Sequence, residues 1–348
     1  MVGVTDLDVR PSNRFGQPAP PTSPRPRPAW PAVVLALPWA GVGMATLVAG
    51  ALPSLQPRST LLAKFSSFID WGLPVWATAT VLLAIGWLVA RRAALLPWLL
   101  VSLLGLGIQA SWVLPYTVSN SRPMAAEQSL RVATLNMEVG GADREQIIAL
   151  ARRTDVLALV EITPAAIVEL RAAGLEEVMP HRVGEGVEAV SGTAVYSRTP
   201  IEQVADLGTS MQSTLTRVST ADGTEVLVAA VHPVNPYSGG AGWAADASRL
   251  RAGLRPHLTE NLVVTGDFNA VRGHVPMRRL RGDGLTDAAD LAGAGPPRTW
   301  PLRDLPFPVI AIDHTLVSPT MTARDFSVQR VANTDHAGLL VTVGVAAG

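Results

Sequence analysis

The stretch NLVVTGDFNA, at residues 261–270, combines a buried strand with a polar end. Residues 262–265 are apolar or β-branched, which favours a strand covered on both faces, and Gly266, Asp267 and Asn269 follow directly. In an α/β fold, residues at strand ends are held on a rigid scaffold and face a shared crevice. The stretch therefore predicts a strand that delivers Asp267 and Asn269 to a functional site.

The same pattern recurs on both sides of this stretch. From residue 130 onward, short apolar runs alternate with helix-like segments and Gly/Pro punctuation, which indicates an α/β domain over residues 130–348. The expected strands are Leu130–Met137, Val156–Glu161, Gly192–Ser197, Thr214–Ser219, Glu225–His232, Leu262–Asp267, Ile312–Val317 and Leu339–Val345. The expected helices are Asp143–Arg153, Pro164–Ala173 and Ala244–His257.

Other expected strands also end in polar residues that are costly to bury without a function. They are Asn136 in LRVATLNM, Glu161 in DVLALVEI, His232 in EVLVAAVHP, Asp313 in AIDHTLVS, and Asp335 and His336 in TDHAG. Each one alone has an ordinary explanation, such as a helix cap or an Asx turn. Because six separate segments show the pattern, we interpret them together as one site. His314 follows Asp313, so strand alternation favours a structural role for it on the opposite face.

The residue types in these segments indicate a hard divalent cation. Carboxylates and carboxamides supply oxygen ligands, which suit Mg²⁺, or Mn²⁺, better than zinc. The chain has no Cys, so disulfides, zinc–thiolate sites and thiol catalysis are excluded. The His-x-x-x-His, His-x-His and His-Glu-x-x-His spacings of zinc hydrolases are also missing from the sequence.

In order, the segments TLNME, VEIT, GTAVYSR, AAVHP, TGDFNA, AIDHTL and NTDHAG resemble the successive blocks of the endonuclease/exonuclease/phosphatase superfamily. The resemblance spans residues 130–345, and GDFN and the late TDH are its most specific parts. It implies a four-layer sandwich in which two mixed β-sheets are flanked by helices. It also implies that Glu161 and Asn136 hold Mg²⁺, with Asp335 close enough to contribute.

The resemblance further implies roles for the remaining strand-end residues. Asp267 would orient or deprotonate the attacking water, and Asn269 would hold Asp267 and a phosphate oxygen. His336, paired with Asp313, would stabilise the transferring phosphoryl group or move a proton. His232 would contact the phosphate and assist the leaving oxygen. This chemistry requires neutralised phosphate oxygens and an activated water, which the set provides.

The N-terminal third has a different composition. The chain is 48% apolar overall, and seven of its nine Trp precede Tyr116. Uncharged runs at residues 28–57, 71–90 and 93–121 each contain the roughly 20 apolar residues that a transmembrane helix needs. We therefore expect three spans within residues 30–121, the alternative being three buried helices of a soluble domain. Residues 1–29 are expected to be a disordered, basic, Pro-rich tail, and residues 122–129 a linker.

Basic residues flanking the spans predict the orientation. Four Arg precede the first span and Arg91 and Arg92 fill the second turn, whereas the intervening loop holds Arg58 and Lys64 with Asp70. Because basic residues favour the cytoplasmic side, the N-terminus is expected to be cytoplasmic and the catalytic domain extracytoplasmic in the cell membrane.

The substrate class is inferred from this membrane context. Residues 123–348 contain 19 Arg and no Lys against 25 acidic residues, a net charge of −6, which argues against a general nucleic-acid binder. The architecture resembles the actinobacterial teicoplanin-resistance membrane proteins of VanJ type, which implies a phosphatase for a phosphorylated lipid of the polyprenyl pyrophosphate kind. An extracytoplasmic nuclease or phosphodiesterase and an inactive membrane scaffold are the alternatives.

Four basic residues after GDFN, namely Arg272, Arg278, Arg279 and Arg281, are candidates for binding a second phosphate. Guanidinium groups pair well with phosphate oxygens. The alternative is that they form a solvated basic loop.

Overall fold

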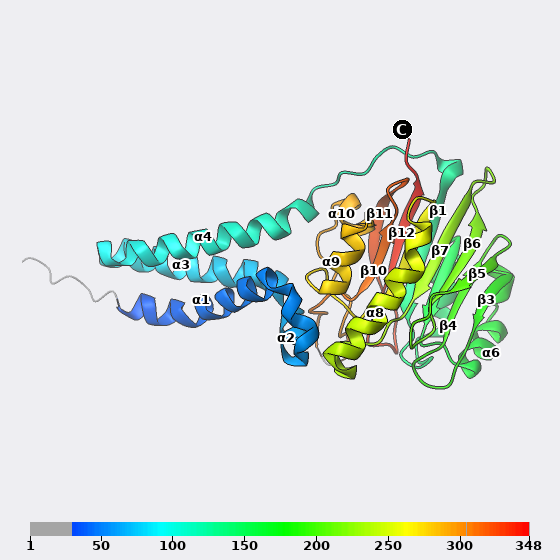
Figure 1. The fold of residues 1–348 in the computed structure, drawn as a ribbon, viewed down its shortest axis with the longest axis horizontal. Coiled ribbons are helices and arrows are strands. Elements are labelled where there is room, and N and C mark those ends of the chain that lie inside the picture. Colours follow the sequence, from blue (N-terminus) through cyan, green and yellow to red (C-terminus); the bar gives the residue numbers. More distant parts are fainter. Residues whose placement is uncertain (1–29, 304, 348) are drawn as a thin grey trace, which may run out of the picture.

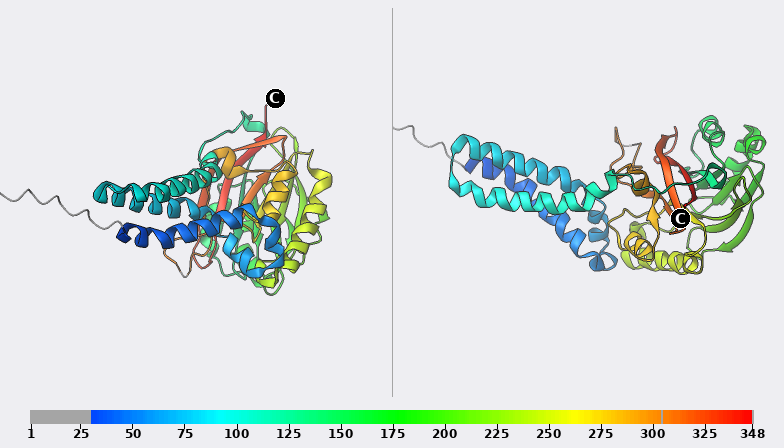
Figure 2. Two further views of the ribbon diagram at one scale, coloured as in Figure 1. Left: turned by 60° about the vertical axis from the view of Figure 1, so that its left-hand side comes forward. Right: turned by 90° about the horizontal axis from the view of Figure 1, so that it is seen from above.

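The computed structural model of the protein describes residues 30–303 and 305–347. Three long helices form a stalk at one end, and an α/β body follows them (Figure 1). The expected tail at residues 1–29 lies outside the described residues. Two further views confirm that the stalk stays on one side of the body (Figure 2).

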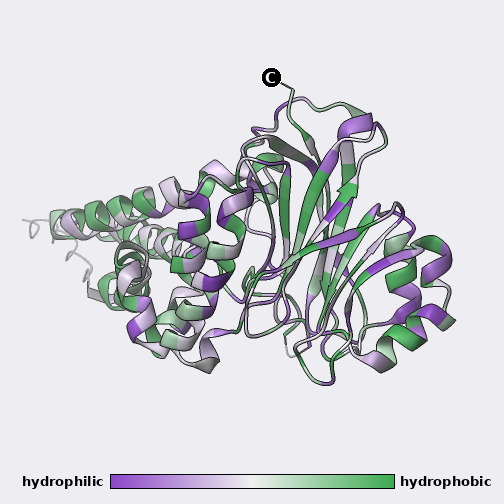
Figure 3. Cartoon of the chain, turned by 45° about the vertical axis from the view of Figure 1, so that its right-hand side comes forward, coloured by the Kyte–Doolittle hydropathy of each residue, from purple (hydrophilic) through white to green (hydrophobic). Residues whose placement is uncertain are grey.

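The stalk consists of α1 (Trp30–Ala51), α3 (Gly72–Ala90) and α4 (Leu96–Val113). The segments Pro31–Ala51, Ile69–Ala90 and Ala93–Thr117 are long and apolar enough to cross a membrane. Large apolar side chains remain exposed along them, for example Leu100 at 65% and Leu104 at 66%. Hydrophobic residues make up much of these helices (Figure 3). Such surfaces are costly in water, so the stalk has the properties of three candidate membrane spans.

The first helix is shorter than the expected run at residues 28–57. The α-helix ends at Ala51, and the chain continues through a 3₁₀ turn at Pro53–Arg58, helix α2 (Thr60–Ser66) and a 3₁₀ turn at Ile69–Trp71. Pro53 starts the first turn, and the Ser59 side chain caps α2 by accepting from Leu62 N at 3.2 Å. Residues 53–71, here called the docking loop, lie against the α/β body (Figure 1).

The body contains two six-stranded mixed sheets. In spatial order, the first comprises β11 (Met321–Arg330), β12 (Ala337–Val345), β1 (Ser129–Asn136), β2 (Val156–Val160), β4 (Thr193–Ser197) and β3 (His181–Glu185). The second comprises β5 (Glu202–Asp206), β6 (Thr214–Ser219), β7 (Glu225–Val231), β8 (Leu262–Asp267), β10 (Asp313–Val317) and β9 (Thr286–Asp287). β1–β2 and β7–β8 are the parallel pairs.

Helices cover the outer face of each sheet, so the predicted four-layer sandwich is confirmed. The first sheet is covered by α5 (Arg144–Ala151), α6 (Pro164–Ala172) and α7 (Leu175–Val178). The second is covered by α8 (Gly240–Leu254) and α9 (Val275–Gly282), while α10 (Ala288–Ala292) lies near β10 and β11. A third apolar cluster, rich in Val, fills the space between the sheets.

All eight expected strands are present within two residues of their expected ends. The sequence did not indicate β3, β5, β9 and β11. β3 and β5 are edge strands with no fully buried residue, so they lack the apolar run that marks the central strands. The expected linker at residues 122–129 runs beside β11, where Arg122 N donates to Thr322 Oγ1 at 2.9 Å.

Gly266 allows β7 and β8 to meet closely where the site begins. Its φ is +145°, and a Cβ there would lie 2.1 Å from Val231 O. A side chain would therefore push the two parallel strands apart. Gly266 thus fixes the position of the next residue, Asp267.

Candidate active site

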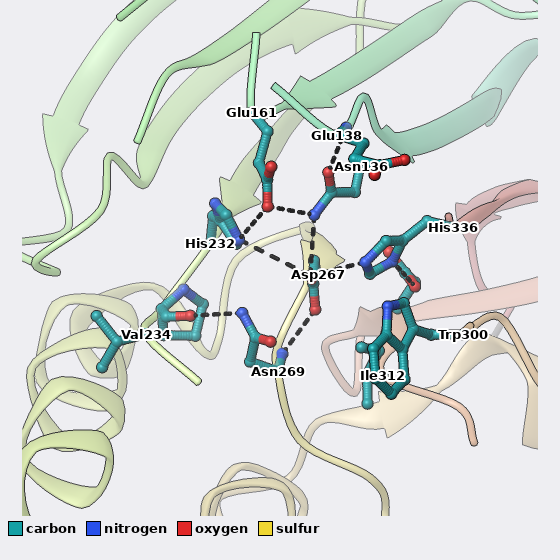
Figure 4. A network of polar contacts seen from close by, with 12 residues as sticks. Asn136, Glu138, Glu161, His232, Val234, Asp267, Asn269, Trp300, Ile312 and His336 are labelled. Atoms are coloured by element: carbon teal, nitrogen blue, oxygen red, sulfur yellow. Dashed lines mark hydrogen bonds and ion pairs between the residues drawn. The ribbon is translucent and has the colours of Figure 1, made fainter. Parts of the chain in front are cut away.

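The strand ends predicted to carry polar residues meet at one edge of the sandwich (Figure 4). Asn136 ends β1, Glu161 follows β2, His232 follows β7 and Asp267 ends β8. Asp313 starts β10, and His336 directly precedes β12. Glu161, His232, Asp267 and His336 border a cavity of about 320 Å³, here called the central pocket, while Asn136 and Asp313 contact Asp267 and His336 behind it.

Asp267 lies at the centre of this group and is 2% exposed. Its Oδ2 accepts from Asn136 Nδ2 at 3.1 Å, and its Oδ1 accepts from the backbone N–H of Asn269 at 2.7 Å. Burial and the negative charge of Asp313 raise the pKa of Asp267 to about 7. Asp267 is therefore held firmly and is suited to accept a proton near neutral pH.

Glu161 approaches Asp267 from the other sheet. Its Oε1 accepts from Asn136 Nδ2 at 3.0 Å, so one amide group bridges both carboxylates. Its Oε2 accepts from Val139 N at 3.1 Å. Glu161 has a φ of +54°, a left-handed conformation that non-glycine residues adopt at a cost of about 1–3 kcal/mol. The surrounding contacts hold this backbone so that the carboxylate points into the pocket.

His336 and Asp313 form a buried pair beside Asp267. Nδ1 of His336 lies 2.9 Å from Asp313 Oδ2, and Nε2 lies 3.7 Å from Asp267 Oδ2. Burial opposes the charge on the imidazole, but Asp313 and Asp267 outweigh it and raise the pKa of His336 to about 10. His336 is therefore an imidazolium whose Nε2–H faces the pocket.

His232 lies between the two carboxylates, with Nε2 3.7 Å from both Glu161 Oε1 and Asp267 Oδ2. Its backbone N–H donates to Ser213 Oγ at 2.9 Å. Burial and the positive charge of His336 lower the pKa of His232 to about 4. The two imidazoles of the pocket thus differ in protonation, one neutral and one charged.

Asn269 anchors the loop after β8. Its Nδ2 donates to Pro233 O at 3.0 Å, and its φ is +48°. The backbone N–H of Asn269, and not its side chain, is the group that donates to Asp267.

Asp335 borders the pocket beside His336. Its Oδ2 accepts from Trp300 Nε1 at 2.8 Å, and its Oδ1 lies 3.9 Å from His336 Nε2. Trp300 and Glu138 also line the pocket, and sequence reasoning missed both. Trp300 is one of only two Trp outside the N-terminal third, which was a usable signal.

The charges around the pocket favour a bound cation. Glu138, Glu161, Asp267 and Asp335 all line it, while Lys64 is the one Lys or Arg among its described lining residues. An anionic phosphate would be repelled by so many carboxylates unless a cation offset them. The donor set of the pocket therefore fits a divalent metal ion.

Two neighbouring sets of side chains could hold that ion. Asp267, Asp313 and His336 offer ligand atoms within 4.8 Å of one another. An imidazolium at His336 has no lone pair for a metal, however, because Asp313 holds its Nδ1–H and Nε2 also carries a proton. Glu161 and Asn136, which share a hydrogen bond beside Asp267, are the better candidates.

The Endonuclease/Exonuclease/phosphatase family matches residues 133–336, more than half of the chain. The chain belongs to this family. It is accordingly a metal-dependent hydrolase of phosphoester or phosphoanhydride bonds. No curated protein sequence matches it.

Several solved structures resemble this family member. An endonuclease/exonuclease/phosphatase from Beutenbergia cavernae is 21% identical, with a TM-score of 0.49, covering 63% of this chain and 72% of that one. D. rerio TDP2, complexed with a single-strand DNA product, is 16% identical with a TM-score of 0.48, covering 62% and 99%. Sphingomyelinase C from Streptomyces griseocarneus is 19% identical with a TM-score of 0.45, covering 62% and 98%.

The four candidate arginines of this family member lie away from the central pocket. Arg272 is buried, forms an ion pair with Asp290 and stacks on Tyr116 at 3.5 Å. Arg278 and Arg281 line a separate cavity next to the stalk, and Arg279 faces a third. The structure therefore does not bring them to the predicted phosphate site.

His314 points away from the pocket, as strand alternation predicted. Its Nδ1 lies 2.8 Å from Asp287 Oδ2, and its Nε2 lies 3.0 Å from Ala270 O and 3.2 Å from Ala311 O. Both ring nitrogens are thus occupied by internal partners.

Proposed function

We propose that this chain is a membrane-anchored, Mg²⁺-dependent phosphatase for a lipid-linked substrate of the polyprenyl pyrophosphate type, acting at the outer membrane face. The observation that carries the proposal is the composition of the central pocket. Carboxylates and imidazoles occupy its floor, while Phe68 from the docking loop and Tyr237, Ile310 and Ile312 from the body add apolar walls. A phosphate joined to an apolar chain matches both surfaces.

Glu161 and Asn136 would hold the ion, with Asp335 at the edge of the pocket. Bound there, Mg²⁺ would neutralise phosphate oxygens and so lower the cost of nucleophilic attack. Asp267 accepts a proton from the attacking water, for which its raised pKa and buried position suit it. The Asn269 N–H and the Asn136 amide keep the Asp267 carboxylate in a fixed orientation.

The two imidazoles act on the opposite side of the phosphoryl group. His336 donates its Nε2–H to a phosphoryl oxygen, and Asp313 keeps that imidazole charged and oriented. His232 is neutral and contacts a second oxygen on the leaving side. This division supplies one base and one positive donor within the same pocket.

The membrane location supports a lipid substrate. Three candidate spans precede the catalytic domain, and the flanking Arg pattern predicts that this domain is extracytoplasmic. Lipid phosphates are abundant at that surface, and the net charge of −6 over residues 123–348 disfavours tracking a nucleic-acid backbone.

The proposal is tested with the full-length protein in detergent or nanodiscs. Phosphate release is measured with Mg²⁺ from farnesyl pyrophosphate, farnesyl monophosphate and nucleotides, and nicking of plasmid DNA is followed in parallel. Wild type is compared with Glu161→Ala and with Glu177→Ala, an exposed residue of α7 that serves as the matched control. We expect turnover of the farnesyl substrates that Glu161→Ala abolishes and Glu177→Ala retains.

Other outcomes select the alternatives. Nicking of plasmid DNA without release from the lipids would favour an extracytoplasmic nuclease. Protein that is inert toward every phosphoester with Mg²⁺ or Mn²⁺ would favour a membrane scaffold.

A further inference from the structure

The docking loop is fixed to the catalytic domain by buried polar contacts. Gln56 is fully buried, and its Nε2 donates to Gly273 O at 3.2 Å while its Oε1 accepts from Val275 N at 2.9 Å. Gly273 lies in the turn between GDFN and α9, and Val275 is the first residue of α9. One side chain of the docking loop therefore satisfies two backbone groups of the domain, which fixes the position of the loop on the domain.

Helix α2 is held in the same way. Ala63 is fully buried in the apolar cluster around Trp243, and its carbonyl lies 2.8 Å from His274 Nε2. His274 Nδ1 accepts from Val271 N at 3.1 Å, so Nε2 carries the proton that Ala63 O receives. The residue after Ala63 is Lys64, whose position is thus determined by the docked helix.

Aromatic residues next to the stalk helices add three further contacts. Trp71 Nε1 donates to Val309 O at 2.8 Å, and Arg298 lies over the Trp71 ring at 4.1 Å. Tyr116 lies under Arg272 at 3.5 Å. The last residue of the docking loop and the segment after α4 therefore also join the stalk to the domain.

Lys64 extends from α2 to the central pocket. Its ammonium lies 3.6 Å from the centre of the Tyr237 ring, and both residues line the pocket together with Asp267 and His336. Within the described part of the chain it forms no ion pair. A cation–π contact at a partly exposed site is worth about 0.5–1 kcal/mol, so this contact is weak enough to leave the ammonium available to an anionic ligand in the pocket.

Lys64 is the only lysine in the sequence, and the pocket has no arginine among its described lining residues. We propose that Lys64 binds the second phosphate, the one that is not attacked, of a diphosphate substrate. The active site is therefore composite, because the docking loop supplies a substrate-binding residue that the catalytic domain lacks. This inference rests on the proposed function and names the feature that distinguishes a diphosphate from a monophosphate.

The chemistry favours an ammonium at this position. An ammonium is a compact charge on a flexible stem, which can follow a mobile terminal phosphate. The metal ion and His336 would engage the group being cleaved, so the remaining negative charge of a diphosphate needs a separate cation. Lys64 is the only side chain with a permanent positive charge among the described residues that line the pocket.

The test measures kcat and KM of the full-length protein with farnesyl pyrophosphate and farnesyl monophosphate. Lys64→Gln is expected to raise KM for the pyrophosphate about tenfold, the loss expected for one charge-assisted hydrogen bond, and to leave kcat nearly unchanged. KM for the monophosphate should change much less. Lys64→Arg should restore most of the pyrophosphate affinity.

Arg58→Gln is the matched control, because it removes one positive charge from an exposed position of the same loop. It should change neither KM. An unchanged KM in Lys64→Gln, or an equal increase for both substrates, would overturn the assignment. Equal increases in Lys64→Gln and Arg58→Gln would also overturn it, because they would indicate a general effect of charge.

A binding measurement separates this inference from the proposed function. If wild type releases no phosphate from either lipid, the proposed function fails. Calorimetry with methylene diphosphonate and Mg²⁺ then tests Lys64 directly, since this probe is not hydrolysed. About tenfold weaker binding by Lys64→Gln than by wild type supports the assignment, and equal binding rejects it.

Discussion

Two buried His–Asp pairs lie on opposite faces of β10 and differ in one respect. Asp313 pairs with His336 at 2.9 Å, and the next residue, His314, pairs with Asp287 at 2.8 Å. His314 Nε2 is occupied by two backbone carbonyls, whereas His336 Nε2 faces the central pocket. A His–Asp pair is therefore a reactive element only where one ring nitrogen is left for a ligand.

The two pairs also differ in what they contribute. Removal of either His leaves a buried Asp without its main partner, but only removal of His336 also takes a donor from the pocket. Three of the four predictions below test this division, and the remaining one concerns His274.

His336→Ala should have the largest effect, a decrease in kcat of about 10³- to 10⁴-fold, because a proton donor to the phosphoryl group is lost. Because this variant also leaves Asp313 buried without its imidazole partner, the free energy of unfolding should fall as well, so kcat is compared per folded molecule. The control is His181→Ala in edge strand β3, which should retain full turnover. Comparable activity of His336→Ala and wild type would remove His336 from the mechanism.

His314→Ala should lower the free energy of unfolding by about 4 kcal/mol, because it leaves a buried carboxylate with less compensation. Chemical denaturation of the detergent-solubilised protein, followed by Trp fluorescence, measures this loss. Turnover per folded molecule should remain near that of wild type. A selective loss of kcat with unchanged stability would place His314 in the active site instead.

The pH dependence of stability should report His274. Burial lowers the pKa of His274 from 6.5 to about 4, so the folded state favours the neutral ring. The unfolded state therefore binds more protons between these two values. This contribution, about 3 kcal/mol, is fully present above pH 6.5 and is lost as the pH falls to about 4.

His274→Gln is the comparison for this prediction. Its unfolding free energy should decrease less than that of wild type between pH 6.5 and pH 4. Parallel curves for the two proteins would show that another group dominates this range.

Asp313→Asn should have the smallest effect of the four, a decrease in kcat of about 10²-fold with little change in KM. The imidazole stays in the pocket but loses its charged partner. Asp287→Asn is the matched variant in the other pair, and it should reduce stability without reducing kcat. Full turnover by Asp313→Asn would contradict the role of Asp313 as the group that keeps His336 charged.

Much of the fold was predictable because its signal is local. The central strands are buried on both faces, so their apolar runs identify them, and Gly266 marks the close approach of β7 and β8. The polar residues at these strand ends were also visible. Their meeting around Asp267 follows from the sheet order, which places the ends of β1, β2, β7 and β8 at one edge.

The remaining features depend on contacts between distant segments. In the sequence, Lys64 lies in a short connection between two expected spans. It reaches the pocket only because this connection docks on His274 and Val275. The arginines after GDFN illustrate the opposite case. Arginine side chains suit phosphate, but Arg272 forms an ion pair with Asp290. Asp290 lies 18 positions later, and the sequence does not indicate that the two side chains meet.

Arg298 stacks on Trp71, and Arg272 stacks on Tyr116. These contacts fix the stalk to the catalytic domain, so the two are not joined by a flexible connection alone. With the helices seated in a bilayer, the pocket would stay at a fixed height above the lipid plane. Encounters with substrate would then be a two-dimensional search, governed by the mole fraction of the target lipid in the membrane. Such an enzyme would obey surface dilution, slowing when inert lipid is added even though the bulk concentration of substrate is unchanged.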